Sequence, residues 1–145
     1  MDQAQGGSED AMISRTLSYK QTHEQDDPLT HKIISCAIEV HKRRGPGLLE
    51  KLYQESMVIE MELSGLKVDK NVKVAVEYKG KPIGEYYIDV LVEDAVILEL
   101  KSVERHDPVF ESQILSYMRL TGKKVGLLIN FNSKMVKDGI KRFVL

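Results

Sequence analysis

The spacing of apolar residues changes period along this chain, and that change constrains the fold more than any other feature. Over residues 28–63 the apolar positions recur at helical spacing, interrupted at Gly45-Pro46-Gly47. From residue 72 they alternate with polar positions, which is typical of half-buried strands. A further helical stretch follows Asp107-Pro108 and ends at Gly122, and an apolar run comes after it. These alternations predict an α/β fold.

The order of the segments predicts a mixed β-sheet flanked by helices. The predicted helices are residues 28–42, about 48–63, and a third that begins at Pro108. The predicted strands are residues 72–78, 84–92, 95–101 and 125–131, with room for a helical turn and a last short strand at 141–145. Residues 79–82 should turn the chain between the first two strands. The run 95–98 is apolar on both faces, so the third strand should be central.

The second predicted helix has an apolar face of its own. The residues expected to form that buried face are Leu48, Leu52, Tyr53 and Ile59. Gly65 suits the position just after the helix, because glycine adopts the left-handed conformation of a C-terminal cap without strain.

Composition separates an acidic tail from the body of the chain. Residues 1–27 are polar and contain six acidic and two basic side chains, so we expect a disordered tail with at most a weak helix near residues 13–19. The body, residues 28–145, carries 16 acidic and 19 basic side chains, a net charge of +3 that is compatible with nucleic-acid binding. The single cysteine, Cys36, excludes an internal disulfide and favours a reducing, cytoplasmic location. No apolar run approaches the roughly 18 residues of a membrane helix, so no membrane association is expected.

Three charged residues interrupt strands that otherwise consist of core residues. Asp89 lies in the second predicted strand, and Glu99 and Lys101 lie in the third. Because side chains alternate between the two faces of a strand, Glu99 and Lys101 point to the same side. A hairpin loop of three residues, 93–95, would set Asp89 opposite Glu99 and bring all three charges together, whereas a two-residue loop would scatter them. A shared site therefore requires an odd loop or a one-residue bulge.

These three residues have the chemistry of a metal-dependent hydrolytic site. Two carboxylates within reach of each other repel unless a cation lies between them. Oxygen ligands with no Cys or His nearby favour Mg²⁺ or Mn²⁺, so we expect Asp89 and Glu99 to bind metal, with the Leu100 carbonyl as a further ligand. Lys101 would orient the attacking water and stabilise developing negative charge, and a phosphodiester is the substrate class that needs this set. The alternative is an ordinary Glu-Lys pair and a hydrogen-bonded Asp.

Three more polar residues are candidates for the same site. Gln113 and Tyr117 lie four residues apart on the third helix, so they share a face and could contact a substrate phosphate or the attacking water. The alternative places Tyr117 in the core and Gln113 on the surface. Glu50 either complements the dipole in the first turn of the second helix or is a third acid near the metal.

A set of ordered segments carries a family resemblance. The segments are residues 29–34, 40–41, 45–50, 88–93, 98–103, 113–117 and 126–132, and Gly47, Glu50 and Tyr53 have the spacing Gly-x-x-Glu-x-x-Tyr. Together they resemble the GxxExxY proteins, a family similar to the PD-(D/E)xK nuclease superfamily. The likeness covers roughly residues 28–145, and residues 1–27 lie outside it.

The resemblance implies a restriction-endonuclease-like αβββαβ core with a metal site on the second and third core strands. By position, the PD-(D/E)xK motif is matched by Asp89, Glu99 and Lys101. The Gln-x-x-x-Tyr helix motif of exonuclease-type members is matched by Gln113 and Tyr117. Glu50 matches the acid that the leading helix contributes in some members. Ile88 stands where the name of the motif has proline.

The hypothesis that follows is a Mg²⁺-dependent nuclease that hydrolyses phosphodiester bonds of DNA or RNA. The alternative is a catalytically silent module with the nuclease fold that binds nucleic acid or a protein partner. The slight positive charge of the body leaves room for a protein partner or a homodimer that supplies nucleic-acid contacts. A purely structural domain would instead bind no metal and would keep Asp89 and Glu99 paired and hydrogen-bonded.

Overall fold

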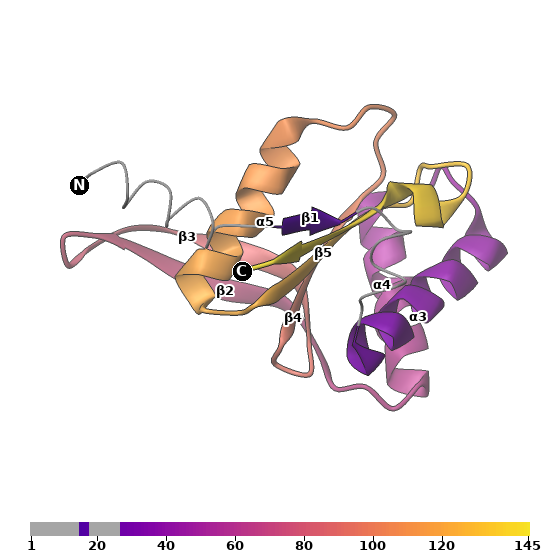
Figure 1. The fold of residues 1–145 in the computed structure, drawn as a ribbon, viewed down its shortest axis with the longest axis horizontal. Coiled ribbons are helices and arrows are strands. Elements are labelled where there is room, and N and C mark those ends of the chain that lie inside the picture. Colours follow the sequence, from indigo (N-terminus) through magenta and orange to yellow (C-terminus); the bar gives the residue numbers. More distant parts are fainter. Residues whose placement is uncertain (1–14, 18–26) are drawn as a thin grey trace.

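The computed structural model describes residues 15–17 and 27–145, which form one mixed β-sheet with helices on both faces (Figure 1). The helices are α3 (Pro28–Arg44), α4 (Glu50–Leu63), α5 (Pro108–Thr121) and the short 3₁₀ helix η1 (Val136–Gly139). The strands are β1 (Arg15–Leu17), β2 (Val68–Tyr78), β3 (Lys81–Val92), β4 (Val96–Lys101), β5 (Val125–Asn130) and β6 (Ile140–Val144). This order confirms the predicted α/β class and is consistent with a restriction-endonuclease-like core.

The sheet of the described residues has the strand order β1-β6-β5-β4-β3-β2. Strands β4 and β5 pair in parallel, joined by the crossover helix α5, and the other neighbouring strands pair antiparallel. Strand β4 lies inside the sheet and is buried along almost its whole length, as its apolar sequence predicts.

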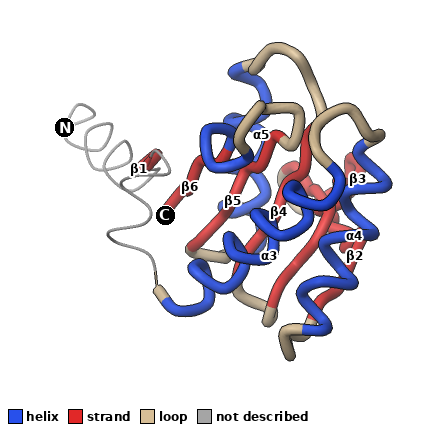
Figure 2. The backbone as a smooth tube through the Cα atoms, turned by 90° about the vertical axis from the view of Figure 1, so that its right-hand side faces the viewer, coloured by secondary structure: helices blue, strands red, loops and turns tan. Residues whose placement is uncertain are grey.

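Two helices cover one face of the sheet and one covers the other. In Figure 2, α3 and α4 lie in front of the strands, and Leu98 and Leu127 pack against them in the larger core cluster. On the opposite face Ile97 and Leu128 pack against Ile114 of α5 in a second cluster. Neighbouring residues of β4 and β5 thus alternate between two cores, which explains why these strands are apolar on both sides.

The ends of α3 and α5 follow their sequence signals. Asp27 caps α3 by accepting a hydrogen bond from the Thr30 N–H at 2.7 Å, with Pro28 in the first helical position. Asp107 caps α5 in the same way, and Gly122 ends it in the left-handed conformation, at φ 73°. Helix α3 continues two residues beyond the predicted end, to Arg44.

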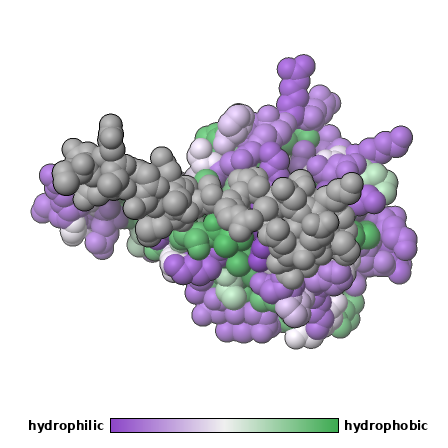
Figure 3. Space-filling view, viewed as in Figure 1, coloured by the Kyte–Doolittle hydropathy of each residue, from purple (hydrophilic) through white to green (hydrophobic). Residues whose placement is uncertain are grey.

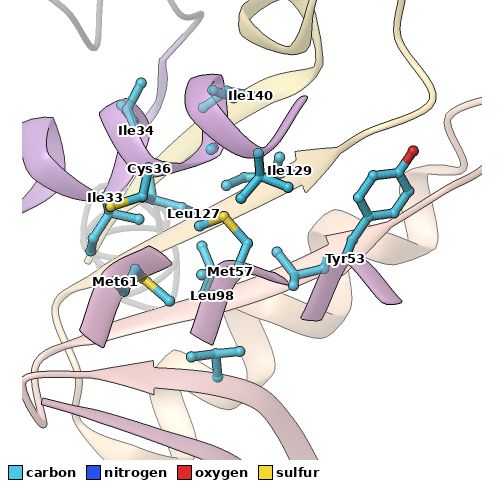
Figure 4. Packing of buried hydrophobic residues seen from close by; sticks show 14 of the residues in the cluster. Ile33, Ile34, Cys36, Tyr53, Met57, Met61, Leu98, Leu127, Ile129 and Ile140 are labelled. Atoms are coloured by element: carbon cyan, nitrogen blue, oxygen red, sulfur yellow. The ribbon is translucent and has the colours of Figure 1, made fainter. Parts of the chain in front are cut away.

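Helix α4 turns only part of the predicted face to the core, because Tyr53 is buried as predicted but Leu52 and Ile59 are not. Tyr53, Met57 and Met61, spaced four apart, are fully buried and pack against β4 and β5 (Figure 4). The Tyr53 ring stacks on Phe131 with centroids 4.4 Å apart. Leu52 and Ile59 are 48% and 59% exposed, so their predicted burial is wrong. The physical reason is that methionine fills irregular core gaps as well as leucine does, so the apolar pattern alone has two solutions.

The β2–β3 hairpin is longer than its sequence pattern predicts. Strand β2 begins at Val68 and β3 begins at Lys81, and only Lys79-Gly80 form the turn. Both turn residues have positive φ, 50° and 81°, as in the two-residue turns that match the twist of a hairpin. The end of the hairpin projects from the body in Figure 1, and Tyr78 there is 63% exposed, contrary to its predicted half-burial.

The N-terminal predictions concern residues that the structure describes only in part. Residues 1–14 and 18–26 lie outside the described residues, so the predicted disordered tail stays a prediction there. Arg15–Leu17 form strand β1, paired antiparallel with β6, and not the weak helix considered for this stretch. The predicted helical turn and last strand are present as η1 and β6.

In residues 15–17 and 27–145, no helix has the length and apolarity needed to cross a membrane. The face shown in Figure 3 is largely hydrophilic, with apolar residues near its centre and in smaller spots toward its edges.

Candidate active site

The β3–β4 hairpin has the register on which the sequence hypothesis depends. Glu93, Asp94 and Ala95 form a three-residue turn, in which Glu93 and Asp94 both have φ 54°. Val92 therefore pairs with Val96, and Val90 pairs with Leu98. The predicted odd loop is confirmed, and equal counting places Asp89 level with Glu99.

The regular β3–β4 ladder stops at this level, and two carboxylates take its place. The Asp89 N–H donates to Glu99 Oε2 at 2.9 Å, and the Leu100 N–H donates to Asp89 Oδ2 at 2.8 Å. Each acid thus accepts a backbone hydrogen bond from the neighbouring strand. The first acid does not project away from the second, because the carboxylate of Asp89 reaches β4 and the carboxylate of Glu99 reaches β3.

Burial makes the pair electrostatically unusual. Glu99 is only 5% exposed, and burial, followed by the charge of Asp89, raises the pKa of Glu99 to about 8. Burial also raises the pKa of Asp89, against the hydrogen bond from Leu100 and the charge of Lys101, which lower it. No described basic residue forms a salt bridge with either acid. Such a pair holds a proton readily, or a cation in its place.

Lys101 and Glu50 both lie within electrostatic range of the two acids. The charge of Lys101 lowers the pKa of Asp89 and of Glu99, and the charge of Glu50 raises both. The Glu50 carboxylate, at the start of α4, accepts a long hydrogen bond of 3.4 Å from the Ser102 N–H. The structure therefore brings together the four charged residues that the sequence selects.

The ammonium group of Lys101 has a second neighbour. Its Nζ lies over the ring of Phe110, 4.4 Å from the centroid, in a cation–π contact with α5. Lys101 also lines a cavity of about 290 Å³ that includes His106 and Lys141. This contact holds the half-buried ammonium on the α5 side of the sheet.

Tyr117 is placed at the same site and Gln113 only near it. Tyr117 is 7% exposed, and burial, followed by the charges of Glu99 and Asp89, raises its pKa to about 12. Tyr117 is therefore compatible with a core role and with a role at the site, since its ring packs in the core while the charges of the two acids act on its hydroxyl. Gln113 lies one turn earlier on α5 and is half-buried.

Two residues beside Asp89 were missed by the sequence argument. The side-chain amide of Gln54, in α4, donates to the Asp89 carbonyl at 2.8 Å and to Asn71 Oδ1 at 3.0 Å. Asn71 has φ 54° inside β2, a conformation that asparagine tolerates better than most residues. Together with Glu50 and Asp89 they line a second cavity of about 290 Å³. Asn71 directly precedes the strand predicted at residues 72–78, so the strand pattern gave no signal for it.

The donor atoms at the acid pair are all oxygens, which suits a hard divalent ion. An N–H and C=O of one strand residue point the same way, so the Leu100 carbonyl faces β3 together with its N–H. Among the described residues no group of three or more His, Cys, Asp or Glu side chains is arranged to hold a metal. An ion here would thus have two carboxylates, a carbonyl and solvent as ligands, which is the usual pattern for Mg²⁺.

The comparisons with known proteins agree with this geometry. A family model described as the PD-(D/E)XK nuclease superfamily matches residues 27–143. The chain belongs to that superfamily, whose members generally use divalent metals and act on nucleic acids. Among curated proteins and among solved structures, no significant match to the chain was found.

Proposed function

We propose that this protein is a nuclease that hydrolyses phosphodiester bonds of DNA or RNA with Mg²⁺ or Mn²⁺. The observation that carries the proposal is the carboxylate pair of Asp89 and Glu99, which replaces the β3–β4 ladder in a buried setting without a described salt-bridge partner. Ionised carboxylates in such a place are destabilising unless a cation binds them.

Each residue of the site has a role that follows from its position. Asp89, Glu99 and the Leu100 carbonyl would hold the ion, which supplies a Lewis acid that polarises a phosphoryl oxygen. Lys101 orients the attacking water and balances the negative charge that develops on the phosphate.

The remaining polar residues support this arrangement. The Tyr117 hydroxyl and the Gln113 amide contact the substrate phosphate or the water from the α5 side. Glu50 adds a third negative charge on the α4 side, which strengthens attraction for a divalent ion.

We also propose that, within the superfamily, the chain is a GxxExxY protein. Gly47, Glu50 and Tyr53 have a structural reason to occur together. The Tyr53 hydroxyl donates to the Gly45 carbonyl and accepts from the Leu48 N–H at 3.2 Å, so it fixes the loop that carries Gly47. That loop presents Glu50 at the start of α4.

The decisive experiment compares cutting by the wild type, Lys101→Ala and Glu99→Gln. We expect the wild type to cut DNA or RNA in Mg²⁺ or Mn²⁺ and both variants to lose at least ~100-fold in rate, with unchanged circular dichroism. Lys32→Ala, at an exposed position on α3, is the control and should cut normally. Equal cutting by Lys101→Ala would end the proposal.

The alternative is a module that binds nucleic acid or a protein partner without cutting. Metal binding and nucleic-acid binding without turnover would favour it. A partner is also compatible with the active protein, because Leu52, Ile59 and Leu63 form an exposed apolar stripe along α4. Glu60 and Glu62 flank this stripe and would repel their counterparts in a homodimer, so we propose a basic partner subunit that adds nucleic-acid contacts.

The test of the partner proposal is the mass of the protein in solution. We expect the chain alone to be monomeric by light scattering and a basic partner to lose affinity for Ile59→Lys. A stable homodimer disrupted by Ile59→Lys would instead establish self-association.

The location we propose is cytoplasmic, because the chain contains a single buried thiol, Cys36.

A further inference from the structure

Tyr86 presents an exposed aromatic ring next to the candidate active site. It lies on β3, level with Val74 of β2, and its ring centroid is 5.2 Å from that of Tyr117, with the rings tilted by 59°. Tyr86 is 42% exposed, whereas Tyr117 is 7% exposed. The two tyrosine rings therefore lead from solvent, at Tyr86, to the buried site, at Tyr117.

The buried ring, that of Tyr117, belongs to the acid site. Burial, followed by the charges of Glu99 and Asp89, raises the pKa of Tyr117, and Tyr86 adds a smaller effect. Tyr86 also precedes Asp89 by only three residues on the same strand. A group that lies on the Tyr86 ring is thus one aromatic ring away from the carboxylates.

On the sheet beside Tyr86, Gly84 leaves a position without a side chain. The residue two positions earlier on the same face is Gly84, which pairs with Val76 across the hairpin. A Cβ at Gly84 would have no heavy atom within 4 Å, so open space adjoins the Tyr86 ring along β3. Gly84 therefore leaves room for a flat ligand on that side of the ring.

The chemistry of a phosphodiester substrate supplies such a ligand. Each phosphate of a nucleic acid is followed by a base, and a base stacks on an exposed aromatic side chain only when it is not already stacked in a duplex. We infer that Tyr86 is the stacking platform for the base of an unpaired nucleotide next to the scissile phosphate, so that the substrate is single-stranded. This inference rests on the proposed nuclease function and names its substrate class.

The neighbouring residue provides a matched control. Tyr87 is 51% exposed and thus at least as accessible as Tyr86, but it lies on the opposite face of the hairpin. Its hydroxyl donates to Glu85, and it pairs with Lys73 across the strands. A general effect of exposed tyrosines would affect both positions, whereas the proposed platform affects only Tyr86.

The experiment measures binding of the full chain to fluorescent oligonucleotides by anisotropy, with Ca²⁺ present to balance the carboxylates. Single-stranded DNA and RNA are compared with a blunt duplex. We expect Tyr86→Ala to weaken single-strand binding roughly 5- to 100-fold and Tyr86→Phe to preserve it, because stacking needs the ring and not the hydroxyl. Tyr87→Ala should bind within about twofold of the wild type, and all variants should bind the duplex alike.

Several results would overturn the inference. These are a wild type that binds no single strand, a Tyr86→Ala variant that binds as well as the wild type, and equal losses at Tyr86 and Tyr87. Circular dichroism and thermal melting of each variant separate misfolding from lost stacking.

The two proposals fail in different ways. If the chain never cuts but Tyr86→Ala loses single-strand binding, the nuclease proposal fails and the platform stands. If the wild type cuts and Tyr86→Ala cuts single strands as fast as the wild type does, the platform fails and the nuclease stands.

Discussion

Glu99 should make the metal-free protein less stable as pH rises, and Glu99→Gln should remove that effect. The folded protein raises the pKa of Glu99 from 4.5 to about 8, chiefly by burial, so folding favours the protonated form. The corresponding stability is fully present below pH 4.5 and is lost as pH rises through about 8. Glutamine imitates the protonated carboxyl group and has no such loss.

The magnitude follows from the same pKa. Each tenfold change in proton affinity corresponds to about 1.4 kcal/mol, so the change from 4.5 to about 8 sets a ceiling of ~5 kcal/mol. Relaxation of the surroundings will reduce this value. Even a difference of ~2 kcal/mol would move the melting temperature of a domain of this size by several degrees.

Urea unfolding between about pH 5 and about pH 9 in EDTA measures the effect as the difference in free energy of unfolding between Glu99→Gln and the wild type. That difference should grow with pH. Glu62→Gln, an exposed carboxylate on α4, is the control and should follow the wild type at every pH. If the free energies of unfolding of the wild type and Glu99→Gln change in parallel with pH, the burial argument is refuted.

Addition of metal tests whether a cation binds the ionised carboxylates of Asp89 and Glu99. The proposed Mg²⁺ ion would bind only the ionised pair, so Mg²⁺ should stabilise the wild type most at high pH, by about 2.7 kcal/mol at a hundredfold excess over Kd. Glu99→Gln should lose most of this gain. An equal gain in the variant would place the ion elsewhere.

Three further predictions concern packing around the site. Met57→Ala should destabilise by about 2–5 kcal/mol and Ile59→Ala by under ~0.5 kcal/mol in urea unfolding, which distinguishes the observed face of α4 from the one expected from sequence. Gln54→Ala should cost about 1–3 kcal/mol and slow cutting in a nuclease assay, because the Asp89 carbonyl loses its partner. Gly126→Val should cost at least ~1–3 kcal/mol in thermal melting, since a Cβ at Gly126 would already lie 2.9 Å from Met118 Sδ.

The register of the acid pair could be predicted from sequence because it depends on counting. Once the loop was taken as Glu93 to Ala95, equal counting along the two strands set Asp89 level with Glu99. The caps at Asp27 and Asp107 were equally accessible, because each is a local signal of an acidic residue followed by proline.

Other features depend on contacts between segments distant in sequence and were not predictable in this way. Helix α4 has apolar residues on two faces, and the choice between Leu52 and Met57 is made by the sheet against which it packs. The role of Gln54 depends on its reaching Asp89, 35 residues later in the sequence. The true length of the β2–β3 hairpin depends on pairing of exposed residues, which leave no apolar alternation to read.

The end of the β3–β4 ladder explains why the site and the fold are inseparable. Where two strands part, their N–H groups lose backbone acceptors and must find others. Here Asp89 and Glu99 supply those acceptors, so the same carboxylates stabilise the strand ends and remain close together in a buried place. Replacing either with an apolar residue would leave an N–H unpaired as well as removing a charge. Amide substitutions are therefore the informative ones, because Asp89→Asn and Glu99→Gln keep an oxygen acceptor and change the charge alone.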